Sequence, residues 1–67
     1  MQTRTPEKIE KYLNEKEVAE MLSIPVRTIQ TWRFLKKNIP FHRLGRSVRY
    51  RLTDVEQFAS KNAIAVS

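Results

Sequence analysis

The sequence predicts a mostly α-helical domain with a small β-hairpin, and three observations support this fold class. Two short amphipathic segments are separated only by the residues around Pro25, and a proline there ends one helix while allowing another to begin at once. The apolar spacing then changes to the alternation of strands on both sides of Gly45 and Arg46. A third helical segment follows the hairpin.

The first helix is expected from about Glu15 to Leu22, because a capping signal stands at its start. Asn14 and Glu17 form a capping box, and Leu13 before the cap can pack on Val18. The apolar side consists of Val18, Ala19, Met21 and Leu22, and the side facing water consists of Glu15, Lys16, Glu17 and Glu20.

The second helix is expected from Val26 to about Lys36, after a turn of three or four residues. Helical spacing makes Ile29, Trp32 and Leu35 its inward positions, and we interpret Trp32 as a core anchor rather than a platform for base stacking. The opposite side carries Arg27, Gln30, Thr31 and Phe34, with Arg33 and Lys37 at its edge. Two helices joined by so short a turn form a helix-turn-helix.

The hairpin is expected around Gly45 and Arg46, because a glycine at the first central position suits a two-residue type II′ turn. Its register pairs Phe41 with Tyr50, His42 with Arg49, Arg43 with Val48, and Leu44 with Ser47. One face then carries Phe41, Arg43, Val48 and Tyr50, and the other carries His42, Leu44, Ser47, Arg49 and Arg51. We expect the first face to pack on the helices and the second to remain polar and cationic, so that the hairpin is a basic wing.

The third helix is expected to start at a second capping box, formed by Thr53 and Glu56, and to run to about Lys61. Val55, Phe58 and Ala59 are its expected core-facing residues. The predicted domain therefore spans residues 12–61, between flexible tails at 1–11 and 62–67.

Length and composition restrict the classes of function. A chain of 67 residues makes one domain with no room for a roofed active site. It has no cysteine and a single histidine, His42, so we expect no enzyme activity, no metal, no cofactor and no small-molecule substrate. The N-terminal residues lack the apolar stretch of a signal peptide and no membrane span is present, which predicts a bacterial cytoplasmic or nucleoid location.

The positive charge is confined to one part of the chain, which we call the basic block (residues 27–51). The net charge of the whole chain is +6, whereas the block alone holds eight Lys and Arg residues and no acid. A solvated face kept for solubility is the alternative, but mixed signs would serve solubility equally well. Aromatic residues also interrupt the block. A polyanion, above all double-stranded DNA, is therefore the expected partner.

The outer side of the second helix carries the expected base contacts. Arg and Gln form bidentate pairs with guanine and adenine in the major groove, which suits Arg27, Gln30 and Thr31. Phe34 has two alternatives, contact with a thymine methyl or packing under the wing. The expected contacts to the DNA backbone or minor groove are Arg33, Lys36, Lys37, Arg43, Arg46, Arg49 and Arg51.

The order of the signals LNEKEVAEMLSIPVRTIQTW, FHRLGRSVRYR and LTDVEQFAS resembles the excisionase and prophage-regulator family of MerR-like winged helix-turn-helix proteins. The resemblance covers about residues 12–59. The matching positions are Thr28 and Trp32 in the recognition helix, Leu44, Gly45, Arg46 and Arg49 in the wing, and Thr53, Asp54, Glu56 and Phe58 at the last helix. The departures are Asn14 for the usual Thr or Ser cap and Ser23 for the usual turn glycine.

This resemblance implies a winged helix-turn-helix fold and adds Thr28 to the expected base contacts. It also implies an excisionase-type recombination directionality factor that shapes attachment-site DNA for an integrase, with further copies of itself on adjacent sites as partners. The alternatives are a small transcription regulator of a prophage or mobile element and, less favoured, a basic RNA-binding protein, because the major groove of A-form RNA is too deep and narrow for a reading helix.

Overall fold

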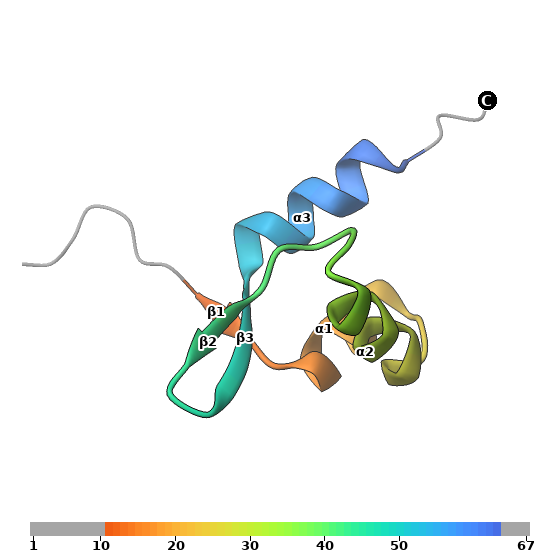
Figure 1. Ribbon diagram of the computed structural model, residues 1–67. Helices are drawn as coiled ribbons and strands as arrows, with labels where there is room; N and C mark the ends of the chain where they lie inside the picture. The colour runs from red at the N-terminus through yellow and green to blue at the C-terminus, as the bar shows by residue number, and fades with distance from the viewer. Residues whose placement is uncertain (1–10, 64–67) are drawn as a thin grey trace, which may run out of the picture.

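A computed structural model describes residues 11–63 and contains three helices and a small antiparallel sheet (Figure 1). In chain order the elements are β1 (Tyr12–Leu13), α1 (Glu15–Leu22), α2 (Val26–Leu35), β2 (His42–Leu44), β3 (Ser47–Arg51) and α3 (Leu52–Lys61). The predicted fold class, a mostly α winged helix-turn-helix, is confirmed. The predicted tails lie outside the described residues, except for residues 11 and 62–63.

Helix α1 begins at the predicted cap. The Glu17 backbone N–H donates to Asn14 Oδ1, and the Asn14 backbone N–H donates to Glu17 Oε1, both at 2.8 Å. Val18 and Ala19 are buried as expected. The prediction for Met21 was wrong, because its side chain is 45% exposed. At 100° per residue, Met21 lies on the far side of Val18 from Ala19, beyond the stripe that meets the core.

The turn between the helices keeps a left-handed residue without a glycine. Ser23 caps α1 with φ 57° and ψ 42°, and its backbone N–H donates to the carbonyls of Ala19 and Glu20. The Ile24 backbone N–H also donates to the Ala19 carbonyl, at 3.0 Å. These bonds satisfy carbonyls at the helix end, while the side chain of Ser23 makes the left-handed conformation costly.

Ser23→Gly should therefore stabilise the protein by about 0.5 to 1 kcal/mol, because glycine removes the left-handed strain but loses more backbone entropy on folding. Urea denaturation followed by circular dichroism measures this free energy of unfolding. The matched control is Ser60→Gly inside α3, which should destabilise by roughly 0.5 kcal/mol. Destabilisation by both variants would contradict the strain at Ser23.

Helix α2 contributes less to the core than its spacing predicts. Ile29 is buried, and the half-buried ring of Trp32 packs on Phe58 with 5.3 Å between ring centroids. Leu35 was predicted to face inward but is 54% exposed. The helix ends at Leu35, where Lys36 turns left-handed with φ 54° and caps it, so the chain leaves the core before another helical turn can be buried.

The wing has the predicted register where strands β2 and β3 pair. The Cα partners are His42 with Arg49, Arg43 with Val48, and Leu44 with Ser47. The predicted pair of Phe41 and Tyr50 lies just beyond this ladder, with ring centroids 6.3 Å apart. Gly45 has φ 66° and Arg46 a negative φ, as a type II′ turn requires.

The two-stranded wing of the prediction is in fact extended by β1. Tyr12 pairs with Arg51 and Leu13 with Tyr50, so the strand order is β1-β3-β2 and β3 is central. The backbone N–H of Leu52 continues this edge by donating to the Lys11 carbonyl at 2.9 Å. A strand of two residues is too short to show alternation, which is why the sequence did not predict it.

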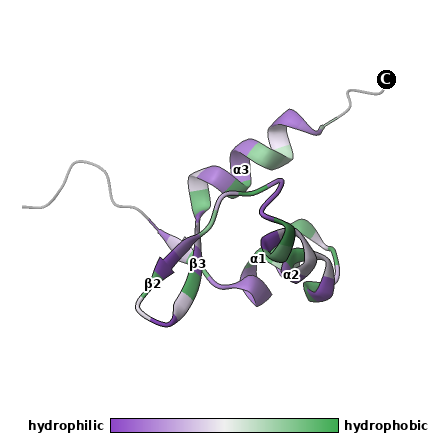
Figure 2. Cartoon of the chain, viewed as in Figure 1, coloured by the Kyte–Doolittle hydropathy of each residue, from purple (hydrophilic) through white to green (hydrophobic). Residues whose placement is uncertain are grey.

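Helix α3 starts at Leu52, directly after β3, with Arg51 as its N-cap residue, and the Arg51 side chain does not cap the helix. The predicted capping box at Thr53 was therefore wrong. The Lys11 carbonyl already binds the Leu52 amide, and Thr53 lies inside the first turn. Figure 2 shows hydrophobic and hydrophilic bands alternating along α3. Val55 is buried, but Ala59 is exposed, contrary to prediction, because it lies one turn further along α3, beyond the buried part of this helix.

The core lies between the helix pair, the sheet and the start of α3. Its buried members are Leu13, Val18, Ala19, Ile29, Ile39, Tyr50 and Val55. Every described element except β2 contributes at least one of them. None of the helices in the described part of the chain has the length and apolarity of a bilayer-spanning segment. The core holds α2 by one side only, so the opposite side of this helix is available to a partner.

Candidate nucleic-acid interface

The outer side of α2 is open to solvent, and we call its residues the reading face (Arg27, Gln30, Thr31 and Phe34). All four side chains are exposed, whereas Thr28, which the resemblance added, is half-buried. Phe34 is 82% exposed, so it does not pack under the wing. The reading face, together with Arg33 and Leu35, lines a shallow hollow of about 350 Å³.

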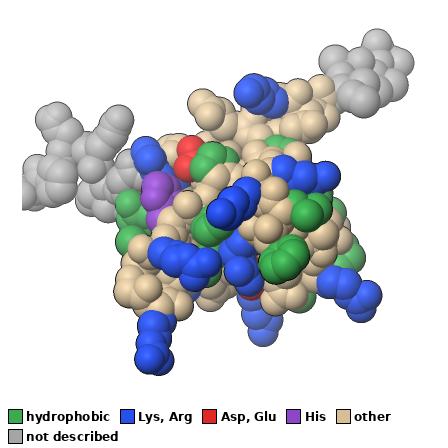
Figure 3. Space-filling view, viewed as in Figure 1, with side chains coloured by type: hydrophobic (Ala, Val, Ile, Leu, Met, Phe, Trp, Pro, Cys, Tyr) green, Lys and Arg blue, Asp and Glu red, His purple; other side chains and the backbone are tan. Residues whose placement is uncertain are grey.

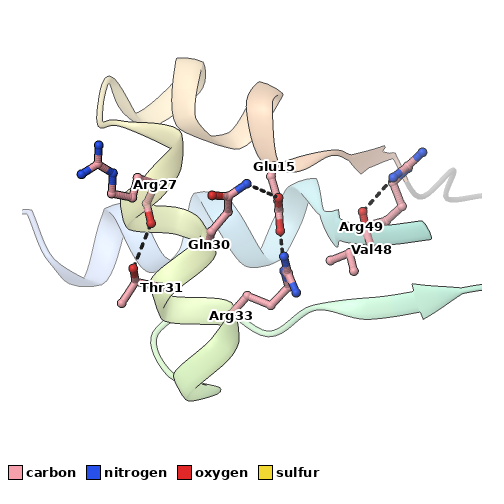
Figure 4. Close-up of polar contacts among 7 residues, drawn as sticks. All are labelled: Glu15, Arg27, Gln30, Thr31, Arg33, Val48 and Arg49. Carbon is pink, nitrogen blue, oxygen red and sulfur yellow. Dashed lines mark hydrogen bonds and ion pairs between the residues drawn. The ribbon is translucent and has the colours of Figure 1, made fainter. Parts of the chain in front are cut away.

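Three members of the reading face, Arg27, Gln30 and Thr31, lie in the first two turns of α2. Figure 4 shows the guanidinium of Arg27 extending away from the other labelled side chains. The hydroxyl of Thr31 donates to the Arg27 carbonyl at 3.0 Å, so its proton is engaged while its oxygen can still accept. The first turns of a recognition helix are the part that contacts base edges. Arg27 therefore offers donors and Thr31 an acceptor to a ligand.

Exposed cations are numerous on the surface of this domain. Figure 3 shows Lys and Arg side chains spread across the face in view, with hydrophobic side chains between them. Of the predicted backbone contacts, Lys36, Lys37, Arg43 and Arg46 are exposed, whereas Arg33, Arg49 and Arg51 are half-buried. Arg43 lies on the strand face predicted to pack, but it is exposed because it sits near the tip of the wing. The exposed cations therefore lie on the segment that directly follows α2 and on the wing.

The other strand face of the wing is more enclosed than the sequence predicts. Arg49 donates from Nη1 to the Val48 carbonyl at 2.8 Å. The ring of His42 meets Tyr12 edge-on, with 6.0 Å between ring centroids. Its Nε2 is buried and has no hydrogen-bond partner within residues 11–63. The Tyr12 ring, which belongs to β1 on the other side of β3, packs against this histidine, so His42 does not stand freely on a strand exterior.

Glu15 is a site residue that sequence reasoning missed. It was expected to face water, but its side chain is only 18% exposed, and its carboxylate forms an ion pair with Nε of Arg33, whose side chain is 28% exposed. It also accepts a hydrogen bond of 3.3 Å from Nε2 of Gln30 (Figure 4). The only signal in the sequence is that Gln30 and Arg33, three residues apart, share one edge of α2.

Tyr50 lies in the core near this ion pair. Its hydroxyl is buried and has no hydrogen-bond partner among the described residues. Burial raises the pKa of Tyr50, the nearby Glu15 carboxylate raises it further, and the Arg33 guanidinium lowers it. The phenol therefore stays neutral at physiological pH, and Glu15 remains the acceptor to which the Arg33 guanidinium donates.

Comparison with known families identifies the domain. The family model described as "Helix-turn-helix domain" matches residues 12–63, which contain every helix and strand of the structure. No curated protein matches the chain. The match covers most of the 67 residues, and it includes the exposed side of α2 and the cations around it. The chain therefore belongs to the helix-turn-helix domain family and is a DNA-binding helix-turn-helix protein.

Proposed function

We propose that this protein binds double-stranded DNA sequence-specifically, with α2 in the major groove and the wing against the backbone or the adjacent minor groove. The single observation that carries the proposal is the reading face. Its side chains stand outside the core on a helix whose other side is buried. Exposed cations of the basic block lie on neighbouring elements.

The chemistry of the reading face supports base recognition in addition to attraction for phosphate. Arg27 and Gln30 carry the two side-chain types that form bidentate pairs with guanine and adenine in the major groove. Phe34 is a large apolar side chain exposed among polar ones, and it suits contact with a thymine methyl. The surrounding cations would hold the protein in register without reading sequence themselves.

For the biological role, we propose an excisionase-type recombination directionality factor, which shapes attachment-site DNA for an integrase and binds as further copies on adjacent sites. The wing sequence Leu44, Gly45, Arg46 and the sequence at the start of α3 support this role by resemblance. The alternative is a small transcription regulator of a mobile element. Stimulation of integrase-catalysed excision in vitro would favour the first role, and control of a promoter without it would favour the second.

Two substitutions test the division between reading and positioning. Gln30→Ala should weaken binding to the selected DNA site by roughly 1 to 3 kcal/mol and barely change binding to random DNA, because it removes a base contact. Arg46→Ala, at the tip of the wing, should weaken binding to both DNAs alike and reduce the salt slope by about one unit, because it removes a phosphate contact. Titration of both variants on both duplexes at several salt concentrations measures these changes.

The opposite pattern would contradict the assignment. If Gln30→Ala lowered both affinities equally, or Arg46→Ala selectively lost the selected site, the wing would read the sequence and α2 would only dock. An RNA duplex of the same sequence serves as the third ligand. Tighter binding to that RNA than to the DNA would support the RNA-binding alternative, since α2 cannot enter the major groove of A-form RNA.

A further inference from the structure

We propose that Glu15 is a positioning residue that sets the base preference of Gln30, so that Gln30 reads adenine. The inference rests on the proposed function and adds a specificity determinant from outside the recognition helix. Glu15 is the first residue of α1. It is an acid held against the DNA-facing side of a helix whose own sequence contains none.

The contacts of Glu15 occupy both oxygens of its carboxylate. Oε1 accepts from Nε2 of Gln30 at 3.3 Å, and Oε2 is paired with Nε of Arg33. Figure 4 shows the amide nitrogen of Gln30 turned toward Glu15 and the amide oxygen turned away from it. Because Arg33 neutralises the carboxylate at this point, Glu15 can remain near the reading face without a net repulsion of phosphates.

The orientation of the Gln30 amide follows from the chemistry of its partner. An ionised carboxylate only accepts hydrogen bonds, so the NH₂ end of the amide must face Glu15. A flipped amide would place its oxygen against the carboxylate and leave both unsatisfied. The end that remains free presents the carbonyl oxygen and the second N–H, which are one acceptor and one donor. Adenine offers the complementary pair in the major groove, a donor at N6 and an acceptor at N7.

The charge of Arg33 predicts a contact with the DNA backbone, but its pairing with Glu15 gives it a supporting role instead. Its Nε is engaged by Glu15 and its side chain is mostly buried, so it supports Glu15 and is not among the free phosphate contacts. A purely structural role for the pair, holding α1 against α2, would alter binding to every duplex equally. A positioning role alters the preference at one base pair. This difference separates the two in an experiment.

The test uses the full chain and a site selected from a random duplex pool, with each base pair of the site replaced in turn. Glu15→Gln is nearly isosteric, but its amide can both donate and accept, so it no longer dictates the orientation of the Gln30 amide. We expect the preference for adenine at the base pair read by Gln30 to fall by up to about 5-fold, and by less than in Gln30→Ala, which removes the whole bidentate pair. Preferences at the other base pairs should stay unchanged.

Glu20→Gln is the matched control. Glu20 is exposed on the same helix, and its carboxylate has no hydrogen bond or ion pair within residues 11–63. Glu20→Gln removes the same charge without releasing Arg33, and it should leave every base preference intact. The double variant with Gln30→Ala and Glu15→Gln should show the same base preferences as Gln30→Ala alone, because Glu15 acts through Gln30. Thermal melting of each variant checks that the fold is kept.

The outcomes for the inference and for the proposed function are distinct. If the parent protein prefers no duplex over random DNA, the proposed function fails. If the parent prefers its site but Glu15→Gln retains the full adenine preference, or loses affinity for all duplexes alike, the inference fails and the proposed function stands. A selective loss at the base pair that Gln30→Ala also affects supports both.

Discussion

The affinity for duplex DNA should fall about 500- to 2,000-fold when the salt concentration rises from about 50 to about 200 mM. The basic block holds eight cations and no acid. Its exposed cations are Arg27 on α2, Lys36 and Lys37 directly after this helix, and Arg43 and Arg46 on the wing, whereas Arg33 is engaged by Glu15. If about five or six cations neutralise phosphates, counterion release gives a slope of log K against log salt of roughly −4.5 to −5.4.

Fluorescence anisotropy of a labelled duplex over a salt series measures this slope. Lys61→Ala is the control, because Lys61 ends α3 outside the basic block, and it should leave the slope unchanged. A slope near zero in the parent protein would mean that the exposed cations do not contact phosphates. The proposed docking of the wing on the backbone would then be wrong.

The second large effect concerns stability. Ile29→Ala should destabilise the protein by about 2 to 5 kcal/mol, because it removes a fully buried side chain and leaves a cavity. Ile29 is 1% exposed and stands in the core with Val18, Tyr50 and Val55. The loss is comparable with the roughly 3 to 10 kcal/mol expected for a domain of this length, so we expect a largely unfolded protein at 37 °C.

Leu35→Ala is the matched comparison on the same helix. Sequence spacing gives both residues the same inward role, but Leu35 is half-exposed, so its truncation should change the free energy of unfolding by less than about 1 kcal/mol. Urea denaturation monitored by circular dichroism measures both values. Equal destabilisation by the two variants would mean that the core extends to the end of α2.

The features that the sequence predicts well are determined within a few residues. The capping box of α1 needs only Asn14 and Glu17, and the turn of the wing needs only Gly45 and its neighbour. Such signals act between residues close in the chain. The register of the wing follows from the turn, which is why the pairing of β2 with β3 was predicted correctly.

The features that the sequence did not predict depend on contacts between distant residues. Strand β1 forms only because β3 offers it an edge, and the Lys11 carbonyl then moves the start of α3 to Leu52. Helical spacing tells which side of a helix is apolar but does not tell how far the core extends along it. Met21, Leu35 and Ala59 are apolar residues that lie where the apolar side of each helix extends beyond the core, so they are exposed.

The candidate site also contains both kinds of feature, those that local spacing predicts and those that depend on contacts between distant residues. The exposure of Arg27, Gln30, Thr31 and Phe34 follows from the burial of the opposite side of α2, so spacing alone predicts it. The contact of Glu15 with α2 depends on how α1 crosses that helix, which spacing does not specify. A charged residue at the start of a helix is normally assigned to solvent, and only the packed structure shows that this one is held between two helices.

The central position of β3 has a consequence for synthesis of the chain. The sheet joins residue 12 to residue 51, so the core cannot close until the ribosome has released the chain through β3. Because the contacts of the helix pair are local, we expect this pair to form early and the long-range strand pairing to form last. A nascent chain that ends before β3 already carries the reading face but lacks Tyr50 and Val55, which bury Ile29 in the finished core. The pairing of β3, the last strand to be synthesised, is thus the step that completes the core under α2 and fixes the position of the reading face.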